Sequence, residues 1–174
     1  MKPSKFKEPV FHKSKILPPK GFMAITLFGH VFVREEYWTY QVSSDFHKMQ
    51  IWNQMKFHET IHIRQAAKEH DSWFIFYMKY LGYWIRNLFH SGFHNNIAYN
   101  CIPYEMEAYY KQTYWKKEPD YNCSLLDKFK NISYKLAIKT MKESYIWRWN
   151  ILDLLLYKNE EQINELISEY CKER

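Results

Sequence analysis

Apolar positions recur with helical spacing over most of the chain, and most regularly in residues 46–70. This segment contains no Pro or Gly and carries apolar side chains on two sides. It follows three polar residues that are able to cap a helix, Ser43, Ser44 and Asp45. A helix that is apolar on two sides is buried, so we predict that residues 46–70 form a helix in the core.

Residues 72–89 are the most apolar part of the chain. Their only charges are Lys79 and Arg86, seven residues apart and therefore on one face of a helix. This pattern fits a central core helix, or a helix lying in the plane of a membrane with its cations at the lipid headgroups. We favour the core helix, because the preceding helix must pack against something.

Further helices are predicted in the second half. Pro103 stands where it can start a helix over residues 104–117, and apolar spacing predicts a long helix over residues 125–149. A short apolar segment and a last amphipathic helix, which a capping box formed by Asn159 and Gln162 would start, complete the chain. The segments predicted to be loops are residues 90–94, 95–103 and 116–122.

The N-terminal part has a different pattern. Residues 1–20 are basic, contain four prolines and are predicted to be an extended arm outside the core. Residues 22–28 and 30–33 are β-prone runs around Gly29, which predicts a hairpin or one bent strand. The predicted fold class is therefore mainly α (α+β), with residues 21–174 as a single domain.

Composition limits the partners that we expect. Aromatic residues make up 20% of the 174 residues, so the core is rich in rings, and the net charge of +6 is compatible with anionic partners. The basic residues are spread along the chain, however, and no groove-reading or RNA-binding motif is present. We therefore expect no binding to nucleic acid.

Cysteine use and the N-terminus indicate the compartment. The three cysteines are odd in number and widely spaced, which suggests neither a disulfide framework nor a CxxC zinc site. The N-terminus lacks the apolar stretch of a signal peptide, and no run of 18 uncharged apolar residues is present. We expect a cytoplasmic protein. The alternative is a cytoplasmic protein that also contacts a membrane peripherally through residues 72–89.

The first predicted helix contains His58-Glu59-Thr60-Ile61-His62, an HExxH motif. Residues four apart lie one turn above each other, so both imidazoles can bind one metal ion, while Glu59, about 100° round the helix, can reach a water. This arrangement suits Zn²⁺, beside which a carboxylate serves as general base. The other interpretation is two ordinary histidines on an amphipathic helix, but burying two histidines and a carboxylate needs a reason.

A catalytic zinc site needs a third protein ligand, and no third histidine follows the motif closely. Glu105 and Glu107 stand at the start of the helix that Pro103 opens. They are two residues apart, roughly 200° round a helix, so only one of them can be the ligand.

These motifs together resemble the gluzincin metallopeptidases, in particular small bacterial zinc-peptidase-like proteins. The matching residues, within about residues 22–110, are His58, Glu59, His62, Arg64, Gln65, Pro103, Glu105, Glu107, Ala108 and Tyr109. The resemblance implies a zincin-like helical domain. In membrane-type gluzincins the ligand Glu stands three residues before an Ala, which selects Glu105, whereas the thermolysin-like pattern would select Glu107. We expect His58, His62 and Glu105 to bind Zn²⁺.

Two positions depart from the family's pattern. Phe57 replaces an Asn directly before the motif, which is a harmless change. Tyr109 stands where membrane-type gluzincins have an Asp, and this removes a group that would orient a ligand histidine. The departure weakens the expectation of activity more than that of metal binding.

The expected function is that of a zinc-dependent metallopeptidase that hydrolyses peptide or protein substrates through metal-activated water, with Glu59 as general base. A tyrosine such as Tyr99, Tyr104 or Tyr109 would stabilise the oxyanion. Arg64 and Gln65 would fix helices to each other, and Gln65 would hydrogen-bond a ligand if it faces the site.

The sequence leaves alternatives for the role of one segment and for the function of the protein. The β-prone segment over residues 22–33 is either a strand edge that holds substrate or a lid over the helices. The whole protein is either a peptidase or a catalytically inactive, zincin-derived structural or interaction protein. In the second case a bound metal only ties helices together, and residues 72–89 contact a membrane or a partner.

Overall fold

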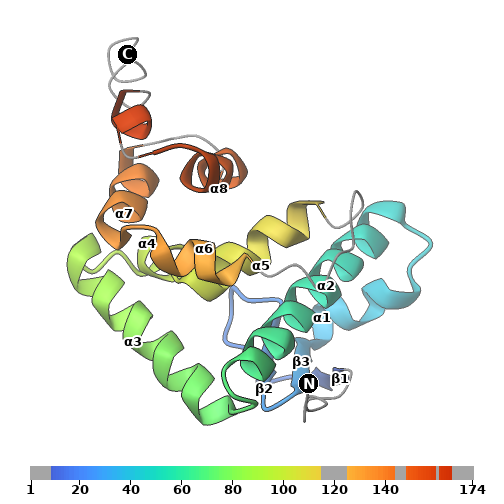
Figure 1. Ribbon diagram of the computed structural model, residues 1–174. Helices are drawn as coiled ribbons and strands as arrows, with labels where there is room; N and C mark the ends of the chain where they lie inside the picture. The colour runs from blue at the N-terminus through green and yellow to red at the C-terminus, as the bar shows by residue number, and fades with distance from the viewer. Residues whose placement is uncertain (1–8, 115–124, 144–147, 160, 166–174) are drawn as a thin grey trace. The chain divides into compact units, whose positions relative to one another are not determined.

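The computed structural model describes residues 9–114, 125–143, 148–159 and 161–165. It is mainly helical with one small sheet near the N-terminus (Figure 1), which confirms the predicted fold class. The chain divides into two compact units, which we describe separately. Unit 1 comprises Met1–Tyr77 and Lys111–Tyr121, and unit 2 comprises Met78–Tyr110 and Asn122–Arg174. Two compact units can belong to one domain, so the single domain over residues 21–174 stays a prediction.

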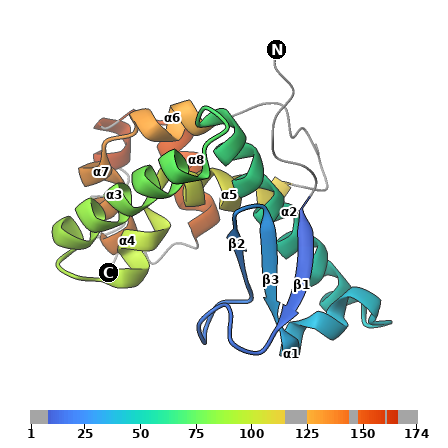
Figure 2. The ribbon, with the colours of Figure 1, turned by 90° about the horizontal axis from the view of Figure 1, so that it is seen from below.

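The sheet of unit 1 has three strands, with β3 between the other two (Figure 2). Strands β2 (Ala24–Leu27) and β3 (His30–Arg34) pair antiparallel, which is the hairpin that the sequence predicts. Strand β1 (Val10–Ser14) pairs parallel to β3. Residues 10–14 of the predicted extended arm therefore form an edge strand, and they contain no proline to interrupt it.

The turn between β2 and β3 consists of two residues with positive φ, Phe28 at 52° and Gly29 at 86°. Positive φ at both central positions is what a tight hairpin turn needs, and it strains any residue other than glycine. Tyr77 holds Phe28 in place. Its hydroxyl oxygen accepts from the Phe28 backbone N–H (3.0 Å), while its O–H donates to the Thr26 carbonyl (3.1 Å). A single phenol thus fixes the strand end nearest to the turn.

The HExxH motif lies on the long helix α2 (Phe46–Lys68), after the short helix α1 (Glu35–Trp38) and the 3₁₀ helix η1 (Thr39–Val42). Asp45 caps α2 by accepting hydrogen bonds from two backbone N–H groups of the first turn, as the sequence predicts. The inner face of β3 packs on α2 through a cluster formed by Val31, Val33, Trp52, Met55 and Ile63. The helix is buried on several sides from residue 57 to residue 63, which confirms its predicted place in the core.

In the part of the chain that the structure describes, α2 is followed by α3 (Trp73–Ser91), α4 (Asn95–Asn100), α5 (Pro103–Tyr114), α6 (Leu126–Asn131), α7 (Tyr134–Glu143) and α8 (Arg148–Tyr157). Helices α3 and α5 confirm two predictions, and α5 begins at the predicted proline. The prediction of loops is wrong at His90 and Ser91, which lie within α3, and at residues 95–100, which form α4. The loop predicted over residues 116–122 lies outside the described residues.

The long helix predicted over residues 125–149 is also wrong, because α6 ends before Ile132 and α7 begins after Ser133. Ser133 accepts the Leu136 backbone N–H through its hydroxyl oxygen (3.5 Å), as a residue that caps a new helix does. Near the C-terminus, Asn159 and Gln162 exchange the two hydrogen bonds of the predicted capping box, at 3.1 and 2.9 Å. The last predicted helix is described only at residues 161–165.

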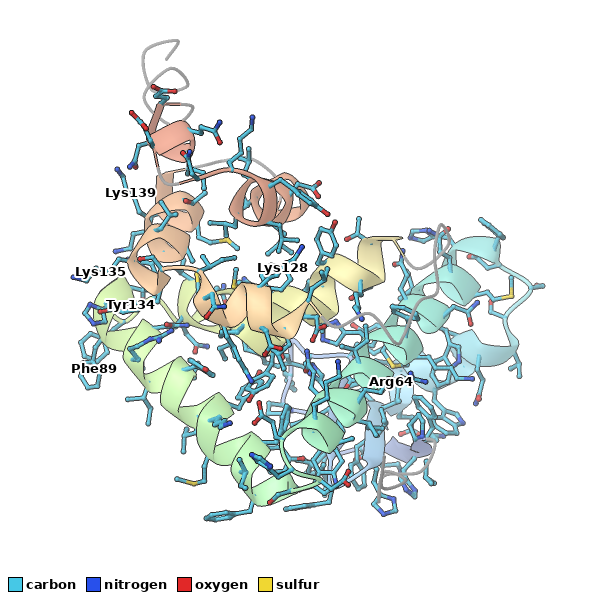
Figure 3. The ribbon with its side chains drawn as sticks, viewed as in Figure 1. Arg64, Phe89, Lys128, Tyr134, Lys135 and Lys139 are labelled. Atoms are coloured by element: carbon cyan, nitrogen blue, oxygen red, sulfur yellow. The ribbon has the colours of Figure 1, made fainter. Side chains whose placement is uncertain are left out.

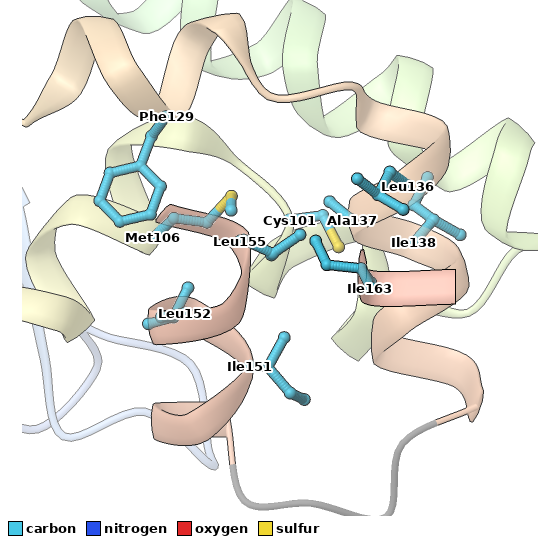
Figure 4. Close-up of a cluster of buried hydrophobic side chains, with 10 residues drawn as sticks. All are labelled: Cys101, Met106, Phe129, Leu136, Ala137, Ile138, Ile151, Leu152, Leu155 and Ile163. Carbon is cyan, nitrogen blue, oxygen red and sulfur yellow. The ribbon is translucent and has the colours of Figure 1, made fainter. Parts of the chain in front are cut away.

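Unit 2 has its own hydrophobic core, drawn in Figure 4. It brings together a residue directly after α4, side chains of α5 to α8 and one from the segment after α8: Cys101, Met106, Phe129, Leu136, Ala137, Ile138, Ile151, Leu152, Leu155 and Ile163. Burial raises the pKa of the Cys101 thiol to about 12, so this cysteine stays protonated at neutral pH. The other two cysteines lie outside the described residues. Among the helices described, none combines the length and the apolarity needed to cross a membrane.

Candidate metal centre

The two histidines of the HExxH motif lie one turn apart on α2, and both are buried. Their Nε2 atoms are 3.1 Å apart. The sequence therefore predicted correctly that the helix aims both rings at one point. Burial of α2 against the sheet explains why neither ring turns outward to water.

The opposite nitrogen of each ring is held by a glutamine. Nδ1 of His58 lies 2.9 Å from Oε1 of Gln112, and Nδ1 of His62 lies 2.8 Å from Oε1 of Gln65. Because an amide oxygen only accepts, Nδ1 of each ring is the donor in these bonds, and Nε2 of each ring faces the other ring. Gln65 therefore hydrogen-bonds a candidate ligand, as the sequence analysis expected for a Gln65 that faces the site.

Two ring nitrogens at this distance are joined either by a shared proton, in an N–H···N hydrogen bond, or by a metal ion that both coordinate. Two nitrogens bound to one zinc ion at tetrahedral angles are about 3.3 Å apart, given zinc–nitrogen bonds of about 2.05 Å. The observed 3.1 Å between the Nε2 atoms is close to that value. Hydrogen bonds from the remote ring nitrogens are also what histidine ligands of metals usually have. The histidine pair therefore fits a zinc ion.

The carboxylate of Glu59 is tied to the sheet. The Thr26 hydroxyl, on edge strand β2, donates to Oε2 of Glu59 at 2.6 Å. Among the described residues this is the one hydrogen bond that Glu59 makes, so Oε1 is left to accept from a water. Thr26 thereby holds the carboxylate in one orientation.

Glu105 is buried at the start of α5 in unit 2, surrounded by phenols. The Tyr80 hydroxyl donates to Oε1 of Glu105 at 2.7 Å, and Tyr99 also hydrogen-bonds this carboxylate. Burial, together with the charge of Glu105, raises the pKa of both phenols far above the ordinary value. Both tyrosines therefore stay protonated and serve as donors that hold the Glu105 carboxylate in place.

Glu107 has a structural contact. Its Oε1 accepts the backbone N–H of Leu125 at 2.8 Å, directly before α6. This bond ties α5 to the start of α6, and it gives the buried Glu107 carboxylate a partner that needs no metal.

His58, His62 and Glu105 are all buried, and as a group they could hold a metal ion. Two imidazoles and a carboxylate are a donor set that zinc accepts. The identity of the ion is part of the proposal below.

The remaining predicted residues have other surroundings. Tyr104 is fully buried, with its ring stacked on that of Tyr80 at 6.2 Å, and Tyr109 is half-buried against the core of unit 2. Tyr99 is bound to Glu105, as described above. Arg64 is half-buried on α2 (Figure 3), and its role in fixing helices stays a prediction.

The sequence analysis did not select Gln112, Thr26 or Tyr80. Gln112 stands seven residues after Glu105 on α5, so both lie on one face of the helix. This spacing was the one feature of the sequence that could have indicated Gln112 as a residue of the site. Thr26 is the one buried residue of β2. Side chains of a strand alternate between its two faces, so the sequence shows which of them are buried only once the register of the strand is known. Tyr80 is one of 15 tyrosines, and nothing in the sequence distinguishes it.

The hydrogen bond from Gln112 gives a testable prediction. We expect Gln112→Ala to weaken zinc binding by about 10- to 100-fold, because a ligand histidine loses the group that orients it. Competition with a fluorescent zinc chelator measures the effect. Gln54→Ala is the matched control, since Gln54 is a half-buried glutamine on α2 and makes no hydrogen bond among the described residues. Equal zinc affinity of wild type and Gln112→Ala would contradict the role given to Gln112.

Comparisons with protein-family models, with curated proteins and with solved structures found no match to this chain.

Proposed function

We propose that this protein is a zinc-dependent metallopeptidase of the gluzincin type. In this proposal His58, His62 and Glu105 hold the ion, and Glu59 is the general base. The observation that carries it is the pair of buried imidazoles whose Nε2 atoms face each other at 3.1 Å while glutamine oxygens hold both Nδ1 atoms. Two imidazole nitrogens in this position can both coordinate one metal ion.

A bound zinc ion would act as a Lewis acid that polarises a carbonyl group and makes water more acidic. The side chains of the protein would transfer the proton and position the ligands. Glu59 takes the proton of the attacking water through the oxygen that Thr26 does not hold, and later gives it to the leaving amine nitrogen. Tyr80 and Tyr99 keep Glu105 in place through their hydroxyl groups.

One observation favours the alternative, an inactive structural or interaction protein. The hydrogen bond between Thr26 and Glu59 connects strand β2 to helix α2, which is also what a purely structural carboxylate would do. We prefer the peptidase, because a structural role alone would not require this carboxylate directly beside the two histidines.

Peptide cleavage by the zinc-loaded protein tests the proposal. The protein is incubated with a mixture of unstructured peptides, and new peptide ends are detected by mass spectrometry. We expect cleavage that stops with 1,10-phenanthroline and returns when zinc is added. A protein that holds zinc stoichiometrically and cleaves no peptide in the mixture would favour the structural alternative.

A further inference from the structure

Helix α3 leaves a row of large apolar side chains in water. Met78, Leu81, Ile85 and Phe89 are 53%, 45%, 41% and 64% exposed, and their spacing of three or four residues places them on one face. Phe74 begins the row one turn earlier, and Phe93 follows directly after the helix. Soluble proteins rarely expose a continuous apolar strip of this kind unless something covers it.

The opposite face of α3 is fixed to unit 2. Tyr80 stacks on Tyr104, and the Asn87 side chain donates to the Ala98 carbonyl at 3.1 Å. Rotation of α3 to bury the apolar row would break both contacts. The row is therefore a stable feature of this unit's surface.

A row of lysines lies on the neighbouring helix α7. Lys135, Lys139 and Lys142 are exposed at spacings of four and three residues, and none of the three forms an ion pair among the described residues. Helix α7 begins beside the end of α3, because the ring of Tyr134 lies 4.7 Å from that of His90 and 4.3 Å from the guanidinium of Arg86. Figure 3 shows Phe89, Tyr134, Lys135 and Lys139 along the same edge of unit 2.

The sequence around these two rows carries an excess of positive charge. Residues 72–104 contain no Asp or Glu, and α7 contains one, Glu143 at its last position, although the whole chain has 19 acidic residues. An interface for another protein usually has a rim of both signs, whereas an excess of cations beside an apolar strip suits a surface of anionic lipid headgroups.

We propose that this face, formed by the apolar row of α3 and the lysine row of α7, docks on an anionic phospholipid bilayer. Helix α3 lies in the plane of the interface, with its apolar row among the upper acyl chains and the lysines of α7 at the phosphates. A helix of 19 residues covers about 28 Å along the membrane surface. The interaction is independent of the metal centre.

Vesicle flotation tests the proposal with the full chain. We expect binding to phosphatidylcholine vesicles that contain about 30% phosphatidylglycerol, and much weaker binding to pure phosphatidylcholine. Lys135→Gln/Lys139→Gln/Lys142→Gln should lower the affinity by about fivefold per lysine, or about 100-fold in total, and flatten its dependence on salt. Leu81→Gln/Ile85→Gln should lower it at least about tenfold, because glutamine keeps the helix but removes the apolar anchor.

Matched variants serve as controls. Ile16→Gln/Val42→Gln replaces two aliphatic side chains that are each 83% exposed, and Lys48→Gln/Lys56→Gln/Lys68→Gln replaces three exposed lysines of α2. Both should bind vesicles as the wild type does. If Leu81→Gln/Ile85→Gln does not fold, the lysine variants alone decide.

Three results would overturn the proposal. The first is a wild type that does not bind the anionic vesicles, and the second is an equal loss of binding in the control variants. The third is a wild-type dimer that Leu81→Gln/Ile85→Gln converts to a monomer without changing vesicle binding, since the row would then cover a second copy of the chain.

Discussion

Replacement of Glu59 by Gln is expected to lower the turnover of peptide cleavage by about 100- to 10,000-fold, the usual contribution of a general base. Glutamine has the shape of glutamate and still offers an oxygen to the Thr26 hydroxyl, so the bond that measures 2.6 Å in the wild type keeps an acceptor. It cannot take a proton from water. The loss should therefore appear in turnover, while the zinc content and the melting temperature stay close to those of the wild type.

The comparison variant for this prediction is Thr26→Val. Valine has nearly the same shape as threonine but donates no hydrogen bond, so Glu59 keeps its basic carboxylate and loses only its orientation. We expect turnover between those of the wild type and Glu59→Gln. Peptide cleavage by Glu59→Gln at a rate within a few-fold of wild type would contradict the general-base role.

Replacement of His58 by Ala is expected to remove both metal and activity. A structural zinc ion bound by four ligands contributes about 10–16 kcal/mol, or roughly 2.5–4 kcal/mol per ligand, so loss of one ligand should weaken binding by about 70- to 900-fold. In this variant Nε2 of His62 has lost the second imidazole nitrogen, which lies 3.1 Å away in the wild type. Gln112 has lost the ring to which it is hydrogen-bonded.

Zinc affinity by chelator competition measures this effect. His47→Ala is the control, because His47 is an exposed histidine in the first turn of the same helix. It should bind zinc as the wild type does. Zinc affinity in His58→Ala equal to that in His47→Ala would rule out His58 as a ligand.

Local sequence signals predicted the elements that carry the candidate site. Asp45 marks the start of α2, and the four-residue spacing of His58 and His62 brings their rings together, because both features are set within one helix. The hairpin around Gly29 and the start of α5 at Pro103 are also local features.

Contacts between distant parts of the chain were not predictable in the same way. Strand β1 pairs parallel with β3 across an intervening segment, and no turn in the sequence announces that pairing. The contact of Thr26 with Glu59 depends on the register of β2 against α2, and that of Gln112 with His58 on how α5 returns to α2. The break between α6 and α7 was missed because apolar spacing continues through Ser133, whose hydroxyl favours the start of a new helix.

The measurement that tests the metal centre most directly is the zinc content of purified wild type, Glu105→Gln and Glu107→Gln by elemental mass spectrometry. We expect about one zinc ion per chain in the wild type. Glu105→Gln should lose it and Glu107→Gln should keep it, because Glu107 already binds the Leu125 backbone. A wild type without metal even after zinc is offered, or zinc lost from Glu107→Gln alone, would contradict a site formed by His58, His62 and Glu105.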